Sequence, residues 1–246
     1  MDQQINSQLN NRQSSLLKAI ISEYVETAEP VGSLQLEKKY NLGVSPATLR
    51  NEMANLTKTG YLKQPHTSAG RVPTPMAMKF YITQLMEEKQ MSVVDEVKTK
   101  ENVWDYKNDF DRLMQQTTQV LADKTHSLAV AATEDGDLWR SGHGYVFDNP
   151  EFFDRLVAQS VFSYFDESAR VHNLLFERFT GLSPIEILFG EELGYPNFDK
   201  IGVVGTRFSA QGKQGALAII GPFRQEYAVC IPTMRYFRAL LEELLI

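Results

Sequence analysis

The chain has 246 residues, of which 43% are hydrophobic and 23% are charged, a balance that excludes collagen-like, mucin-like and wholly disordered proteins. Its single cysteine, Cys230, excludes an internal disulfide, and its four scattered histidines lack metal-ligand spacing, so we expect no metal and no cofactor. The formal net charge is −6, but residues 1–80 carry +3 and the remainder −9, which is typical of a basic binding module on an acidic body.

The sequence has neither of two common membrane or export signals. No apolar run approaches the roughly 18 residues that a membrane-spanning helix needs. The first residues are polar and do not resemble a secretory signal. We therefore expect no membrane span and a cytoplasmic location.

The first predicted element is an amphipathic helix over residues 12–27, whose apolar residues form one stripe. It should end before Pro30, because the residue that precedes a proline avoids the helical conformation. Ser33 is a good N-cap for a short second helix over 34–40.

A third helix follows a short turn that contains Gly43. Ser45 caps this helix, Pro46 suits its first position, and Gly60 ends it. Its apolar residues lie at spacings of four and three and should face inward: Leu49, Met53 and Leu56. Two helices joined by a glycine-containing turn are typical of a helix-turn-helix.

A short β-hairpin is predicted next. Residues 61–64 resemble a strand, 65–70 are rich in turn residues, and 71–73 lead back. A hairpin after a helix-turn-helix is a wing. Thr74 and the proline after it should cap a further helix that runs to about Gln90.

The middle of the chain is harder to interpret. Residues 91–102 are polar and charged, and we read them as a linker or helix–helix connection. A helix is predicted over 103–122, with a heptad-like row: Val103, Tyr106, Phe110, Leu113, Thr117 and Val120. This row is either one face of an ordinary core helix or a dimer helix.

The remainder mixes strands and helices and predicts an α+β domain. Strands are expected over 127–133, 144–147, 185–189, 200–208 and 213–220, with a hairpin turn at 209–212. Helices are expected over 150–162 and 167–178. A last helix is expected at the C-terminus, where apolar residues form one stripe: Phe237, Leu240, Leu241, Leu244 and Leu245.

Catalytic signatures are absent from the sequence. We find no dinucleotide fingerprint, phosphate-binding loop, zinc-protease motif or nucleophile elbow. Cys230 lies in an apolar stretch, which predicts a buried, inert thiol rather than a nucleophile. We therefore name no catalytic residue and expect a protein that is not an enzyme.

The third helix carries the most informative polar residues. At 100° per residue, its outward face holds Ala47, Asn51, Asn55 and Lys58, with Thr48 and Arg50 on the flanks. Arg forks to guanine and Asn to adenine in the major groove, and small residues permit close approach. A merely solvated helix face is the alternative. The turn before this helix and the basic hairpin after it favour DNA binding.

The hairpin supplies groups that suit phosphates, namely hydroxyls, small-residue amides and cations. A plain surface hairpin is the alternative. The candidate DNA-binding residues are Ser45, Ala47, Thr48, Arg50, Asn51, Asn55, Lys58, Lys63, His66, Thr67, Ser68 and Arg71. Gly70 would let the backbone come close or take a positive φ.

The stretch from residue 28 to residue 74 strongly resembles the winged-helix domain of the HrcA family of bacterial heat-inducible transcription repressors. The matching pieces are PVGS, SPATLRNEMANL, GYLKQPHTSAGRVPT and, shortly afterwards, KFYI. The segment 215–241 and the DNPEF motif at 148–152 also resemble the family, and 189–192 does so less clearly.

This resemblance implies a fold, a function and partners. The fold would be α+β: a winged helix-turn-helix domain over 1–90, a helical connection or dimer helix over 91–124, and a reduced GAF-like domain over 125–246. The function would be repression of chaperone operons by a homodimer on double-stranded DNA, at the inverted-repeat operator called CIRCE. Heat would release the repressor, and a GroEL-type chaperonin would restore it.

The sequence departs from the family in two places. Family members are longer and carry an inserted segment linked to dimerisation, whereas the region between Lys124 and Asp148 is short here. The family's Thr-Arg-Met after Gly-Pro is replaced by Phe-Arg-Gln over 223–225. Two alternatives remain open: a winged-helix regulator whose GAF-like domain binds a small effector, and an enzyme with an accessory DNA-binding domain.

Overall fold

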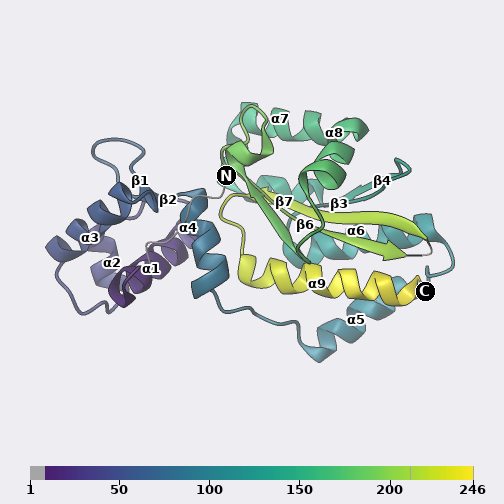
Figure 1. Cartoon of the computed structure of the whole chain (residues 1–246), viewed down its shortest axis with the longest axis horizontal. Coiled ribbons are helices and arrows are strands. Elements are labelled where there is room, and N and C mark those ends of the chain that lie inside the picture. The colour runs from purple at the N-terminus through teal and green to yellow at the C-terminus, as the bar shows by residue number, and fades with distance from the viewer. Residues whose placement is uncertain (1–8, 211, 246) are drawn as a thin grey trace. The chain divides into compact units, whose positions relative to one another are not determined.

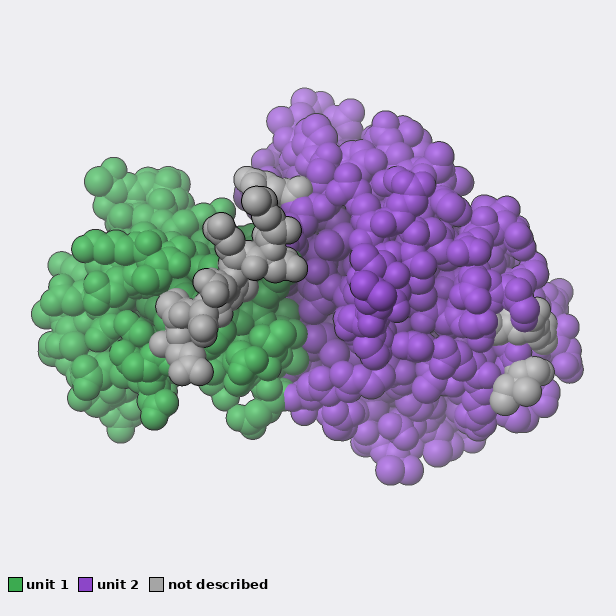
Figure 2. Space-filling model, in the orientation of Figure 1, with its two compact units in different colours: residues 1–87 green, residues 88–246 purple. Residues whose placement is uncertain are grey.

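The computed structural model describes residues 9–210 and 212–245. The chain divides into two compact units, Met1–Glu87 (unit 1) and Glu88–Ile246 (unit 2), which Figure 2 shows in green and purple. Within the described residues, no helix is both long enough and apolar enough to cross a membrane.

Unit 1 begins with three helices, α1 (Asn11–Thr27), α2 (Ser33–Lys39) and α3 (Pro46–Lys58), seen in Figure 1. The first helix ends before Pro30 as predicted, and its C-cap Ala28, two residues before the proline, takes a left-handed conformation at φ 60°. The expected cap of α2 is wrong. Gly32 is its N-cap, and Ser33 is the first helical residue and is buried.

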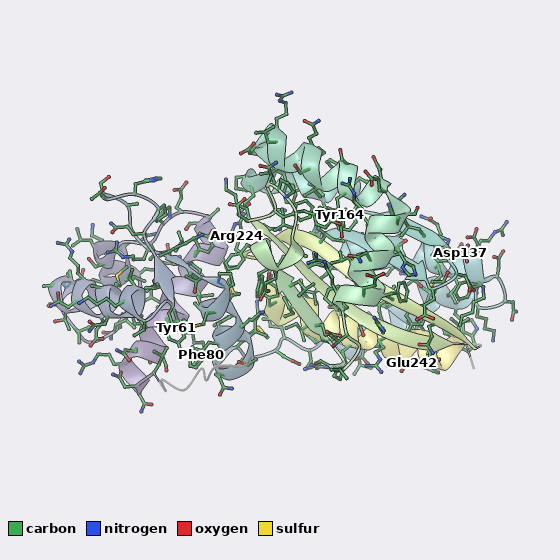
Figure 3. The ribbon with its side chains drawn as sticks, turned by 45° about the horizontal axis from the view of Figure 1, so that its top comes forward. Tyr61, Phe80, Asp137, Tyr164, Arg224 and Glu242 are labelled. Atoms are coloured by element: carbon green, nitrogen blue, oxygen red, sulfur yellow. The ribbon has the colours of Figure 1, made fainter. Side chains whose placement is uncertain are left out.

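A two-stranded antiparallel hairpin follows, formed by β1 (Leu62–Lys63) and β2 (Val72–Pro73). The next helix, α4 (Pro75–Phe80), is capped by Thr74 as predicted. It continues only through one π-helical turn, η1 (Tyr81–Leu85), so the predicted extension to Gln90 is wrong. The rings of Tyr61 and Phe80, both labelled in Figure 3, meet edge to face 5.5 Å apart in the core of unit 1.

Unit 2 opens with two helices where the sequence predicted a linker and one long helix. Helix α5 (Val93–Trp104) is capped by the Ser92 hydroxyl, and α6 (Phe110–Thr125) is capped by Asp109. The polar composition concealed α5 because only Thr99 and Val103 on it are buried. The heptad-like row is therefore broken between the two helices.

The heptad-like row is largely buried within the single chain. Leu113 is 0% exposed, and Tyr106 and Phe110 are half-buried. Leu113, Thr117 and Val120 on α6 are all buried. The row on α6 is thus the face of a core helix.

The core of unit 2 is an antiparallel sheet of five strands among the described residues, in the order β4-β3-β7-β6-β5. The strands are β3 (Leu128–Thr133), β4 (Leu138–Ser141), β5 (Glu186–Phe189), β6 (Ile201–Ala210) and β7 (Lys213–Pro222). Strand β4 was not predicted, and the strand expected at 144–147 is instead part of a 3₁₀ helix, η2 (His143–Asp148). In the predicted turn between β6 and β7, Gln211 lies outside the described residues.

Helices cover both faces of this sheet (Figure 1). Helices α6 and α9 (Tyr227–Leu244) contact the sheet on one face. On the other face, Leu128, Val130 and Ala132 of β3 join a buried cluster. That layer comprises η3 (Pro150–Phe153), α7 (Arg155–Asp166), α8 (Ser168–His172) and a π-helical turn, η4 (Asn173–Arg178); η5 (Gly190–Leu193) follows β5. Unit 2 is therefore an α+β layer structure.

An ion pair joins two distant segments of unit 2. The Arg224 guanidinium, labelled in Figure 3, donates from Nε to Oε1 of Glu151 at 2.7 Å and from Nη2 to Oε2 at 3.2 Å. Both side chains are largely buried. The pair ties η3 to the turn after β7, and these are two of the segments that carry the sequence resemblance.

Candidate nucleic-acid interface

Helix α3 separates its apolar residues from its polar residues as predicted. Ser45 caps it, accepting a hydrogen bond from the Thr48 amide at 3.3 Å, and the two hydroxyls lie 3.0 Å apart. The inward row of Leu49, Met53 and Leu56 is buried. The outward residues are exposed: Ala47, Arg50, Asn51, Asn55 and Lys58. Because the apolar row is buried, the five candidate residues on the other face of α3 are exposed to solvent.

A buried carboxylate fixes α2, the helix that precedes α3. Glu23 on α1 is 3% exposed and accepts hydrogen bonds from Gln35 at 2.6 Å and Tyr40 at 3.1 Å, and Lys39 lies 2.8 Å away. Burial alone would raise the pKa of Glu23, but these hydrogen bonds, led by that of Lys39, hold its pKa below the ordinary value. Sequence reasoning missed this network, whose only signal was a glutamate on the apolar side of α1.

The loop of the hairpin is closed by its own side chain. Gln64 donates from Nε2 to the carbonyl oxygens of Thr67 at 2.9 Å and Ala69 at 3.0 Å. This leaves four candidate residues exposed on the hairpin: Lys63, His66, Thr67 and Ser68. Gln64 was not among the sequence candidates, although it shapes the loop that presents them.

Arg71 is not simply an exposed cation that is available to a phosphate, because its side chain and backbone both bond within unit 1. It is half-buried, and its Nε donates to the Thr57 hydroxyl at 3.1 Å. Its backbone exchanges two hydrogen bonds of 2.9 Å with Val31. Arg71 therefore braces the hairpin against α3 and against the segment before α2.

Gly70 permits this close contact. A Cβ at Gly70 would lie 2.4 Å from the Val31 carbonyl oxygen and 2.7 Å from that of Pro30. Its φ is not positive, so of the two reasons expected for a glycine, only the close approach holds, and it is to the chain's own backbone.

Between α3 and the hairpin lies an open hollow of about 490 Å³. It brings together four sequence candidates: Arg50, Thr67, Ser68 and Arg71. The other candidates lie along α3 or on the hairpin outside this hollow. Leu34 of α2, which is exposed, also lines it and was not predicted. Arg50 belongs both to the hollow and to the outward face of α3, and we call these two regions together the α3–hairpin surface.

The described residues offer no competing metal site, since no group of three or more His, Cys, Asp or Glu side chains lies in a metal-holding arrangement. Cys230 is buried in α9, and burial raises the pKa of its thiol to about 12. The predicted burial of the Cys230 thiol is thus confirmed.

Comparisons with known proteins match this chain to one family. The family model of the HrcA protein C-terminal domain matches residues 76–231. The chain is 43% identical over 122 residues to the heat-inducible transcription repressor HrcA of Symbiobacterium thermophilum, which covers 50% of this chain and 36% of that protein. It is 42% identical over 127 residues to the protein of the same name from Clostridioides difficile, covering 52% and 38%.

The fold also has a solved counterpart. A crystal structure described as that of a hypothetical protein superposes with a TM-score of 0.77 at 16% identity, covering 97% of this chain and 99% of the other. The sequence matches, by contrast, span little more than a third of the length of the curated relatives.

Proposed function

This chain belongs to the HrcA family, and from that premise we propose that it is a DNA-binding transcriptional repressor of heat-shock operons. The family model covers more than half of the chain, and the curated relatives are heat-inducible transcription repressors. The observation that carries the proposal is the α3–hairpin surface, in which α3 and the hairpin present guanidinium, amide and hydroxyl groups, several of them in one hollow.

We assign unit 1 to the winged helix-turn-helix class and unit 2 to the GAF-like class. In unit 1, α2 and α3 would be the helix pair and β1–β2 the wing. The first turns of α3 would enter the major groove, because such helices read base edges with their N-terminal residues. Ala47 and Thr48 would allow close approach, Arg50 and Asn51 would read bases, and Asn55 would follow along the groove.

The remaining candidates would hold the DNA backbone. Lys58, Lys63 and His66 can place positive charge or a donor near phosphates, and Thr67 and Ser68 offer hydroxyls and amides. Ser45 contributes by capping α3, and Arg71 by fixing the hairpin while it lines the hollow. These contacts would set the register of the protein on the duplex.

We propose that a homodimer binds an inverted-repeat, CIRCE-type operator and keeps RNA polymerase off the promoter. An inverted repeat mirrors a two-fold axis in the protein. One winged helix also buries too little DNA surface for tight specific binding.

Heat would release the repressor through loss of unit 2 structure, and a GroEL-type chaperonin would restore it. Natural domains hold only about 5–15 kcal/mol of stability, so a modest temperature rise can unfold one. Cys230 is a built-in reporter, because its buried, high-pKa thiol should react with an alkylating reagent only when unit 2 opens. Operator binding and Cys230 protection should therefore be lost together on heating.

A small effector is the competing mode of release. Unit 2 has a hollow of about 280 Å³ lined by Arg207 and Arg238. However, Arg207 donates to the carbonyl oxygens of Leu175, Phe176 and Phe179, and Arg238 donates to Glu242 at 3.1 Å. Because both guanidiniums are engaged, we favour heat release. A melting curve shifted by a ligand would reverse that preference.

The direct test is operator binding by the full chain and by Asn51→Ala. Losing the amide that forks to adenine should cost about 1–3 kcal/mol and relax specificity at one operator position. Asn11→Ala, an exposed asparagine of α1, is the matched control and should bind as the native protein does. If Asn51→Ala kept both affinity and sequence preference, the assigned face of α3 would be wrong.

A further inference from the structure

Helix α5 has two apolar faces, and only one is used within unit 2. Thr99 and Val103 are buried on the inner face. On the opposite side, Val93, Val97 and Trp104 are 75%, 51% and 40% exposed. At 100° per residue these three fall within about 40° of one another, so they form one outward stripe. Soluble helices seldom expose such a stripe without a partner.

The outward stripe borders a shallow hollow with charged edges. The hollow measures about 470 Å³ and is lined by Val97, Lys100, Glu101, Trp104 and Asp105. Lys100 and Lys107 lie over the Trp104 ring, with their Nζ atoms 5.2 and 3.9 Å from its centroid. In Figure 1, α5 lies at the border of unit 2, next to α9. The outer face of α5 is therefore an apolar strip with one acid and one base side by side at its centre.

The order of these residues is self-complementary. If two α5 helices lie antiparallel with a two-fold axis between positions 100 and 101, Val97 of one copy faces Trp104 of the other. The same axis places Lys100 opposite Glu101 twice. A parallel pairing in register would instead set Lys100 against Lys100 and Glu101 against Glu101. Charge complementarity thus selects both a second copy of this chain and one orientation.

We propose that α5 is the dimer seam of this protein, with two copies joined through antiparallel α5 helices centred between Lys100 and Glu101. This pairing would supply the two-fold axis that an inverted-repeat operator requires. Only this role on DNA rests on the proposed repressor function; the dimer itself does not. A contact between two 12-residue helices is small, so the dimer should be weak on its own, with a dissociation constant of about micromolar order.

The first test measures the dimer of the full chain without DNA, by sedimentation equilibrium. Val97→Asp should raise the dimer dissociation constant at least tenfold, because it places two carboxylates in the apolar seam. Leu182→Asp is the matched control: Leu182 is 91% exposed and lies outside α5, so the dimer should be unchanged. Circular dichroism and Cys230 protection verify that each variant is folded.

The second test swaps the central charges. Lys100→Glu and Glu101→Lys should each weaken the dimer at least threefold, and the double variant should restore it, because each pair is then opposite in charge again. Lys100 also pairs with Glu243 within its own chain at 2.6 Å. Glu243→Gln removes that pair and should leave the dimer intact. If Lys100 supported the dimer only through Glu243, the double charge swap would not restore dimerisation.

The alternatives give distinct results. A native chain that stays monomeric at tens of micromolar, a dimer that survives Val97→Asp, or a charge swap that fails to restore dimerisation would each overturn the α5 seam. Dissociation by Phe153→Asp but not by Val97→Asp would move the interface to the exposed patch of Phe147, Phe153 and Leu156. If the native dimer forms through α5 but binds no operator, the repressor function fails and the seam stands.

Discussion

Unit 1 and unit 2 are built on different sequence ranges. In unit 1, the helices, their caps and the hairpin are set by residues close together in the chain, such as Ser45 and Thr48. In unit 2, the sheet pairs β3 with β7, so that Leu128 lies opposite Ile220, a residue far away in the sequence. The comparison teaches that the exposed face of α3 can be inferred from local sequence pattern, whereas the sheet of unit 2 depends on contacts between residues distant in sequence.

The largest expected effect tests whether the two units are separable. Phe237 on α9 is fully buried in unit 2. Phe237→Ala should lower the unfolding free energy of unit 2 by about 3–5 kcal/mol, through lost burial and a cavity. Thermal unfolding followed by Cys230 alkylation should report this loss, while the far-UV signal of unit 1 persists to a higher temperature. Simultaneous collapse of both units would show that they are one cooperative body.

The next effect is confined to unit 1. Gly70→Ala should cost about 1–3 kcal/mol of hairpin stability, because the new Cβ meets the Val31 and Pro30 carbonyl oxygens. Operator affinity should fall while Cys230 protection stays native. Gly144→Ala, where a Cβ meets nothing within 4 Å, is the control. Unchanged operator binding by the Gly70 variant would mean that the hairpin is not part of the interface.

The sequence predicted α3 correctly but failed to predict α5. The cap of α3 and its buried row followed from Ser45, Pro46 and local periodicity. Helix α5 was mistaken for a linker because its inner face buries only two residues against elements distant in sequence. The break between α5 and α6 was hidden by apolar residues on both sides of it.

The contacts that fix the candidate site were equally hidden. The Arg71–Val31 bridge joins segments that no periodicity relates, as the Arg224–Glu151 pair does in unit 2. The outward face of α3 was predictable because it needs only one helix. The bracing of the hairpin by Arg71 was not, because it needs the hairpin, α3 and the segment before α2 together.

A smaller effect distinguishes phosphate contacts from base contacts. Lys63→Ala should weaken binding to operator and random DNA alike, and reduce the slope of log affinity against log salt by about 1. Affinity titrations at several salt concentrations measure this. Lys98→Ala, an exposed lysine of α5, should leave the slope as it is. A loss restricted to the operator would assign Lys63 to base recognition instead.

The smallest effect concerns acid. Because the pKa of Glu23 is lower in the folded protein, its contribution to stability is present above its unfolded pKa of about 4.3 and is lost as the pH falls through the folded value. Unit 1 should therefore lose stability as the pH falls below about 4.3, and Glu23→Gln should flatten that dependence. Denaturant unfolding across pH 3–7 checks this. If the unfolding free energy of the variant fell as steeply at low pH, other carboxylates would be responsible for the loss of stability.

The most direct test of the account is a hydroxyl-radical footprint of the full native chain on a chaperone promoter that carries an inverted repeat. If α3 of each copy reads a half-site, two protected blocks should appear, related by the two-fold axis of the repeat. Asn51→Ala should need a clearly higher protein concentration to protect both blocks, while Asn11→Ala should protect them as the native chain does. Uniform protection along the fragment, or none at concentrations that saturate a control repressor, would contradict sequence-specific recognition by the α3–hairpin surface.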